Sequence, residues 1–368
     1  MRQKLLKWLA CPDCLLPFEI ESVVEEKNED IVSGKIVCSG CKTSYPIKNG
    51  IPRILPDYRE GKNHQLSELY KKQQLTQASF GYEWLNVEIT DFEEDIITFF
   101  RKTGIDSKIY LYLGNPILER DYPTLKDVKY YPDGSFLNGK VILDVGCGMG
   151  RYLNVVKDYK CEAIGLDLSL SVERGRKLLK DYSNIHLVQG DIMNPPFRRE
   201  AFDFMYSIGV LHHTPNTKLA FESIVPLCRI GGTISIYVYP PQYWQDVIRG
   251  TITKILRKLT VRLPHNALMT LCKIAGLSLG KFQIKLAKNK WLKIVGAPFF
   301  LITIPRHNKK GVMVGDTFDL YSPQFIWTHD SKEVTDWFKK NGFKDITVLN
   351  MPTSVKGIRS KTIWKKIF

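Results

Sequence analysis

The sequence has no long apolar run. Its longest, residues 294–304, contains Gly296 and Pro298 and is about half the roughly 20 residues that a membrane-spanning helix needs. The apolar patch at residues 5–11 is too short for the core of a signal peptide. These absences argue against a membrane-spanning protein and predict an intracellular, cytoplasmic one.

Cysteine is also scarce, with eight in 368 residues, which argues against a small disulfide-bonded secreted protein. Four of the eight form two Cys-x-x-Cys pairs, Cys11 with Cys14 and Cys38 with Cys41. In a reducing compartment this spacing favours a metal over disulfides. We expect a tetrahedral four-sulfur zinc site that joins two hairpins, and a structural role for the zinc because so small a unit has little core. The alternative is four buried thiols.

Acidic residues are nearly absent from one stretch of the chain. From residue 246 to 310 there are fourteen lysines and arginines and a single acid, Asp246, whereas the whole chain has a net charge of +15. The net positive charge of the chain is therefore concentrated in this stretch.

Short apolar runs alternate with amphipathic stretches from residue 138 onward. This pattern predicts an α/β fold, a mostly parallel sheet with helices on both faces. The predicted strands are 141–145, 163–168, 185–189, 202–207, 233–239, 346–349 and 362–367, and the predicted helices are 151–159, 172–182, 217–228 and 331–341. We expect four regions: a zinc ribbon at 1–56, a helical linker or cap at 57–135, an α/β core at 136–240 and 321–368, and a basic helical insertion at 241–320.

A glycine-rich turn follows the first core strand. Gly146, Gly148 and Gly150 come within five residues and open a helix, so the backbone can approach an anionic group closely. Asp167 ends the next strand, where a carboxylate can accept hydrogen bonds from a ribose diol. Asp191 ends the third strand, where it can meet an adenine edge. These positions lie at the carboxyl ends of strands, where open α/β sheets bind ligands.

A dinucleotide-binding fold is the competing interpretation. Its fingerprint is Gly-x-Gly-x-x-Gly, but here the third glycine comes one residue early and Arg151 stands in its place. A pyrophosphate site also leaves Asp191 without a role.

Five segments together resemble the successive motifs of class I S-adenosylmethionine-dependent methyltransferases. They are LDVGCGMG at 143–150, GLDL at 165–168, GDIMNPPF at 190–197, residues 202–213, and GGTISI at 231–236. The resemblance implies a Rossmann-like seven-stranded sheet with one reversed strand, and S-adenosylmethionine as cofactor. The residues it implies for cofactor binding are Asp144, Gly146, Gly148, Gly150, Asp167, Leu168, Asp191, Ile192 and Ser207. The N-terminal unit is similar to the zinc-ribbon activators of tRNA and translation-factor methyltransferases.

Two histidines directly follow the fourth core strand. His212 and His213 lie beside the expected position of the transferred methyl group, and a general base assists transfer to a hydroxyl acceptor. Both are candidates for this base, with His212 slightly favoured, and the alternative is that they pack or hydrogen-bond structurally. Asp319, Tyr321 and His329 are further acceptor-side candidates, each more often structural.

The basic insertion allows three interpretations: a helical lid with a solvated face, an element that contacts an anionic membrane surface, or an RNA-binding surface. We expect the insertion to select the acceptor. The preferred acceptor is a small, lipid-linked or glycan molecule, reached by an enzyme that is peripheral on the inner face of the membrane. Nucleic acid ranks lower, so an RNA or protein methyltransferase is the alternative, and a non-catalytic binding scaffold is a further one.

Overall fold

The computed structural model describes residues 1–56, 68–86, 92–105, 134–241, 247–288, 291–292, 296–305, 310–349, 351 and 353–361. Much of the predicted linker, residues 57–67, 87–91 and 106–133, lies outside the described residues, as does the predicted strand at 362–367. The strands are β1 (Phe18–Lys27), β2 (Asp30–Cys38), β3 (Ser44–Lys48), β4 (Ile51–Ile54), β5 (Val141–Val145), β6 (Glu162–Asp167), β7 (Ile185–Gly190), β8 (Phe202–Ile208), β9 (Cys228–Tyr237), β10 (Phe343–Val348) and β11 (Ser354–Arg359). The helices are α1 (Glu68–Asn86), α2 (Phe92–Thr103), α4 (Arg151–Val156), α5 (Val172–Leu178), α6 (Thr217–Ile224), α7 (Val247–Thr260), α8 (His265–Ala275), α9 (Lys281–Ala287), α11 (Lys310–Tyr321) and α12 (Ser331–Lys340).

The described strands form one sheet in the order β1-β2-β3-β4-β7-β6-β5-β8-β9-β11-β10. Strands β7, β6, β5, β8 and β9 are parallel, whereas β11 runs antiparallel to both β9 and β10. The seven strands from β7 to β10 thus confirm the predicted α/β sheet with one reversed strand. The reversed strand is β11, which the apolar pattern missed because Lys356 and Gly357 interrupt it. Gly357 is required there, since a Cβ atom would lie 2.9 Å from the Phe338 ring.

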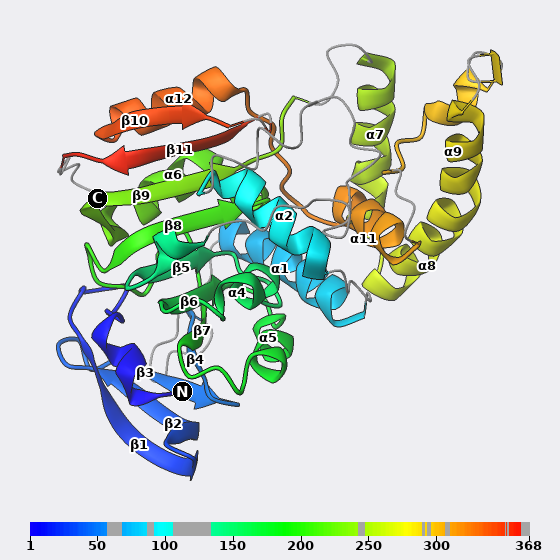
Figure 1. The fold of residues 1–368 in the computed structure, drawn as a ribbon. Coiled ribbons are helices and arrows are strands. Elements are labelled where there is room, and N and C mark those ends of the chain that lie inside the picture. Colours follow the sequence, from blue (N-terminus) through cyan, green and yellow to red (C-terminus); the bar gives the residue numbers. More distant parts are fainter. Residues whose placement is uncertain are drawn as a thin grey trace.

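The zinc-ribbon region extends this sheet. Strand β4 pairs in parallel with β7, with Arg53 opposite Gln189 and Ile54 opposite Gly190. Figure 1 shows the ribbon, in blue, continuing the core sheet beyond β7. The sheet therefore has eleven strands, more than the seven predicted. The sequence did not indicate the junction because β4 has only four residues, one of them a proline.

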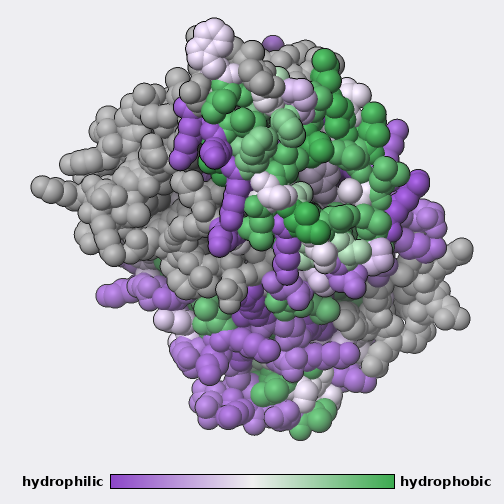
Figure 2. Space-filling model, turned by 90° about the vertical axis from the view of Figure 1, so that its right-hand side faces the viewer, coloured by the Kyte–Doolittle hydropathy of each residue, from purple (hydrophilic) through white to green (hydrophobic). Residues whose placement is uncertain are grey.

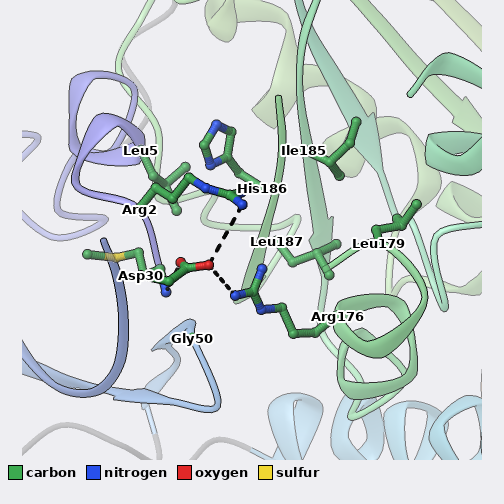
Figure 3. A pocket seen from close by; sticks show the side chains of 10 residues that line it. Arg2, Leu5, Asp30, Gly50, Arg176, Leu179, Ile185, His186 and Leu187 are labelled. Carbon is green, nitrogen blue, oxygen red and sulfur yellow. Dashed lines mark hydrogen bonds and ion pairs between the residues drawn. The ribbon is translucent and has the colours of Figure 1, made fainter. Parts of the chain in front are cut away.

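A buried arginine connects the two regions. The Arg53 guanidinium is 2% exposed, forms an ion pair with Glu173 on α5, and donates to the Gln189 side chain over 2.8 Å. A second connection surrounds Asp30, to which Arg176 of α5 donates over 2.5 Å. Figure 3 shows Arg2 and Arg176 converging on Asp30 from the two sides of this junction.

Replacing Arg53 by methionine is expected to lower the free energy of unfolding by about 3 kcal/mol, because breaking a buried ion pair leaves polar partners without compensation. Urea denaturation of Arg53→Met, with Lys27→Ala as an exposed control, measures the effect. A loss within about 0.5 kcal/mol, as at ordinary surface sites, would mean that the junction does not depend on this arginine.

Helices surround the sheet unequally. In Figure 1, α2 lies in front of the sheet, α1 lies at the ends of the parallel strands, and α7, α8, α9 and α11 form a lobe on the side toward which these strands point. This lobe has its own apolar core, in which Leu268, Met269 and Cys272 of α8 pack against Val314 and Phe318 of α11. The carboxyl ends of the parallel strands thus face both α1 and the lobe.

The lobe also exposes apolar side chains. Ile248, Ile255 and Leu259 of α7 are all more than half exposed, and Figure 2 shows a hydrophobic area flanked by hydrophilic residues on this side of the molecule. Within the described part of the chain, no helix combines the length and hydrophobicity needed to cross a membrane.

Candidate functional site

The four paired cysteines meet as the spacing predicts. Their sulfur atoms all lie within 4.8 Å of one another, with Cys11 and Cys41 3.6 Å apart and Cys14 and Cys38 3.3 Å apart. Tetrahedral zinc with bonds of about 2.3 Å separates its sulfur ligands by about 3.8 Å. The four thiols therefore fit a closed structural zinc site with no open position for chemistry.

The glycine turn adopts the backbone that its sequence requires. Gly146, Gly148 and Gly150 have φ of +83°, +54° and +81°, in the left-handed region that favours glycine. At Gly146 a Cβ atom would lie 2.3 Å from the Val210 side chain. The turn brings backbone against the ends of β5 and β8.

Asp167 fastens this turn to the end of β6. One carboxylate oxygen accepts from the Gly148 N–H over 2.8 Å. The other accepts from the N–H and hydroxyl of Ser169 over 2.7 and 2.6 Å. Burial raises the pKa of Asp167, while these hydrogen bonds oppose the shift. The adjacent Leu168 carbonyl accepts from the Gln189 side chain over 2.9 Å.

Asp191 and Ile192 follow β7 at the same edge of the sheet. The Asp191 carboxylate accepts from the Met193 N–H over 2.8 Å and from the Gln73 side chain over 2.7 Å. The Ile192 carbonyl accepts from the Ser223 hydroxyl over 2.6 Å. Burial raises the pKa of Asp191.

Asp144 and Ser207 lie deeper, at the ends of β5 and β8. Asp144 is 2% exposed, and its Oδ2 has no hydrogen-bond partner within the described chain. Burial raises the pKa of Asp144 well above its usual value. The Ser207 hydroxyl donates to the Val145 carbonyl over 2.9 Å, and the Ser207 backbone stands opposite Ile236 in the pairing of β8 with β9.

Helix α1 crosses these strand ends, and its part in the site was not predicted. Besides Gln73, it carries Trp84, which lies against Gly148, 3.5 Å from where a Cβ atom would be. The Trp84 carbonyl accepts from Arg174 of α5. A helix with few apolar residues and scattered aromatics gives no sequence signal for such a role.

The two histidines follow β8 in different surroundings. His212 is fully buried and stacked on Tyr239 at 3.9 Å between ring centroids, and neither ring nitrogen has a hydrogen-bond partner among the residues described. His213 Nδ1 contacts the Phe325 carbonyl at 3.0 Å, and its Nε2 lies 3.6 Å from an Asp319 oxygen. Burial lowers the pKa of both histidines, although Asp319 opposes the shift at His213.

The other acceptor-side candidates differ in their contacts. The second Asp319 oxygen accepts from the Tyr239 hydroxyl over 2.7 Å, which places Asp319 beside the histidines. The Tyr321 hydroxyl donates to the Thr303 carbonyl within the lobe. His329 contacts Thr217 and Glu333 with its two ring nitrogens. These side-chain contacts are structural, although the His329 backbone N–H donates to the carbonyl of Tyr239, which stacks on His212.

Two family models match the chain. Residues 143–236 match a methyltransferase domain, and residues 2–50 match a Trm112p-like protein. Probable tRNA methyltransferase 9B of Homo sapiens is 34% identical over 107 residues, 27% of this chain and 22% of that protein. tRNA (carboxymethyluridine(34)-5-O)-methyltransferase of Arabidopsis thaliana is 40% identical over 108 residues, 28% of this chain and 25% of that protein. The chain thus spans about a quarter of the length of these relatives.

A solved complex between the Haloferax volcanii Trm112 methyltransferase activator and a putative methyltransferase is also similar. It is 20% identical, covers 43% of this chain and 68% of that one, and has a TM-score of 0.28, too low to carry an argument. The family matches confirm the predicted S-adenosylmethionine-dependent methyltransferase domain and, with the cysteine cluster, the zinc ribbon.

The predicted acceptor is wrong. A small, lipid-linked or glycan acceptor was preferred, with an anionic membrane as partner and nucleic acid ranked lower, whereas the named relatives are tRNA methyltransferases and the N-terminal match is to a Trm112p-like protein. The error has a physical origin. Lysine-rich helices attract the phosphates of lipid head groups and of RNA alike, so composition alone does not separate the two.

Proposed function

We propose that this chain, a class I S-adenosylmethionine-dependent methyltransferase that carries its own zinc ribbon, methylates RNA of the tRNA class. The union of a Trm112p-like region and a methyltransferase domain in one sheet carries the proposal. Similarity of the core to tRNA methyltransferases supports it. With tRNA as its substrate, the protein would act in the cytoplasm.

The donor site is proposed at the strand ends described above. Asp167 would hold the ribose, Asp191 and Ile192 the adenine, and Asp144 with the turn at Gly146 the methionine part, while Gly148, Gly150, Leu168 and Ser207 complete the site. S-adenosylmethionine supplies an activated methyl group, so the protein has to align the acceptor and exclude water. We favour His213 over His212 as base, because its Nδ1–H is oriented by a carbonyl and its Nε2 faces Asp319.

The RNA surface is proposed on the lobe. Lys281, Lys285 and Lys288, on and directly after α9, are exposed, and Phe282 and Trp291 near them are 42% and 77% exposed. Cations that meet phosphates and aromatic rings that stack on unpaired bases are the two elements of single-stranded nucleic-acid binding. Exposed apolar rings here therefore have a use in an RNA complex.

Charge reversal on α9 is expected to weaken RNA binding. The triple variant Lys281→Glu, Lys285→Glu, Lys288→Glu loses three phosphate contacts, so the salt dependence of tRNA affinity should fall by about one unit of slope per lysine. Filter binding of bulk tRNA over a series of salt concentrations measures this change.

The matched control reverses three exposed lysines on or beside α12, away from the lobe: Lys332, Lys339 and Lys340. This control should bind tRNA with wild-type affinity and slope. Equal losses in both triple variants would reflect net charge alone, and no loss in the α9 variant would exclude this face as the RNA surface.

A further inference from the structure

Helices α1 and α11 bring two carboxylates together beside the histidines. Ser79 of α1 donates to Ser322, which directly follows α11, over 2.5 Å. Glu83 stands one turn after Ser79 on α1, and Asp319 stands one turn before Ser322 on α11. Burial raises the pKa of Glu83 well above its usual value, and the charges of Asp319 and Asp316 add to this shift while Arg151 opposes it. Glu83 and Asp319 therefore interact across the helix pair.

Each of these carboxylates keeps an oxygen that lacks a donor. Glu83 is 3% exposed, and its Oε2 accepts no hydrogen bond from the described residues. Asp319 uses Oδ2 for the Tyr239 hydroxyl, but its Oδ1 likewise has no hydrogen-bond donor in the described chain. Buried acceptors without donors are costly, so this place suits a ligand that donates.

A third buried polar atom lies beside Asp319. His213 Nε2, on a side chain 5% exposed, lies 3.6 Å from Asp319 Oδ1, beyond hydrogen-bond distance. It has no hydrogen-bond partner of its own among the described residues. Phe80, one turn before Glu83 on α1, packs its ring edge on His213. The cluster therefore contains two acidic side chains and one histidine, each with a buried polar atom that has no hydrogen-bond partner in the described chain.

Two arginines act on this cluster, Arg151 on Glu83 and Arg257 on Asp319, and both also contact other groups. Arg257 donates to the carbonyls of Leu320 and Pro323, and Arg151 lies 5.7 Å from the centre of the Trp84 ring. A carboxylate acceptor has no N–H or O–H to donate to the unpaired oxygens of Glu83 and Asp319, and its charge would add to the repulsion that already acts between these two acids. An N–H group instead supplies the donors that both carboxylates lack.

We propose that the methyl acceptor is a nitrogen of a nucleobase that bears hydrogen, an amine or a ring N–H, and that Glu83 and Asp319 hold it through its N–H groups. This inference rests on the proposed RNA methyltransferase function and names its acceptor. It differs from the Arabidopsis thaliana relative, whose name specifies carboxymethyluridine.

The donor, the acceptor nitrogen and His213 account for every bond and proton in the methyl transfer. The nitrogen lone pair forms the new N–CH₃ bond while the S–CH₃ bond breaks, and its electron pair stays on sulfur as a thioether. The acceptor nitrogen then loses a proton to His213 Nε2. The resulting imidazolium lies against the Asp319 carboxylate, and Nδ1–H remains bonded to the Phe325 carbonyl.

The first test is the chemistry of the product. Bulk tRNA is labelled with S-adenosylmethionine that carries a radioactive methyl group and is then treated with mild alkali. N-methyl label should stay on the RNA and appear in N-methylated nucleosides after digestion. Label released as volatile methanol, which shows a methyl ester, would overturn the inference while leaving RNA methylation intact.

The second test uses no RNA, so it tests the role of the two acids even if the chain does not methylate RNA. Sinefungin carries an amine where S-adenosylmethionine has its methyl sulfonium, and S-adenosylhomocysteine lacks both. By calorimetry, the wild type should bind sinefungin about tenfold more tightly than S-adenosylhomocysteine, because charged hydrogen bonds to the carboxylates hold the amine.

Variants assign the effect to the two carboxylates. Glu83→Gln and Asp319→Asn should each remove most of the sinefungin preference, with S-adenosylhomocysteine affinity unchanged as the check on folding. Glu68→Gln, an exposed position on the same helix, should keep the preference. A wild type without preference, or variants that retain it, would overturn the role of this pair.

Discussion

Replacing Asp167 by alanine is expected to weaken S-adenosylmethionine binding by about 100-fold or more. The carboxylate would lose two charge-assisted hydrogen bonds to the ribose, each worth about 1.5–3 kcal/mol. It would also lose the bonds that hold Gly148 and Ser169 in place, so the glycine turn would no longer be fixed to the end of β6. Isothermal calorimetry with S-adenosylmethionine measures both affinity and stoichiometry.

Two companion variants separate charge from folding. Asp167→Asn keeps the shape but removes the negative charge, and should bind with intermediate affinity. Asp158→Ala, at an exposed position after α4, should bind as the wild type does. If Asp167→Ala binds as tightly as the wild type, the ribose assignment is wrong and the donor lies elsewhere.

Replacing Cys38 by serine is expected to abolish zinc retention and unfold the ribbon. Metal binding supplies folding free energy in domains too small to hold a large core, and Cys38 is a fully buried member of the cluster. Because β4 pairs with β7, the damage should reach Asp191 at the end of β7 and lower donor affinity as well. Atomic absorption measures the loss of zinc, and limited proteolysis of residues 1–56 measures the unfolding of the ribbon.

The control is another buried cysteine outside the cluster. Cys161 donates to the Val156 carbonyl, a bond that serine can also make, so Cys161→Ser should retain zinc and resist proteolysis. Full zinc content in Cys38→Ser would remove this residue from the metal site. Chelation of the wild type should reproduce the Cys38→Ser behaviour without any substitution.

Periodicity and spacing predicted the parts of the molecule whose signals are local. Strand β5, the glycine turn after it and the cysteine cluster each depend on residues close in sequence, where a short apolar run, left-handed glycine and Cys-x-x-Cys spacing have direct physical meanings. The reversed strand β11 was not predicted, because its Gly357 is required by close packing against Phe338, and such a tertiary contact is not visible in the sequence pattern.

The parts that were not predicted depend on contacts between distant segments. Gln73 and Glu83 lie on a helix with weak patterning, and only the fold brings them to Asp191 and Asp319. The pairing of β4 with β7 joins segments more than a hundred residues apart. The acceptor was misjudged because basic charge suits lipid and RNA phosphates equally.

Transfer of labelled methyl groups from S-adenosylmethionine to purified bulk tRNA is the most direct test of the central claim. The zinc-loaded full chain should place ribonuclease-sensitive label in tRNA, and Asp167→Ala should place almost none. A wild type that binds S-adenosylmethionine but labels protein or a lipid extract, and no RNA, would contradict the claim.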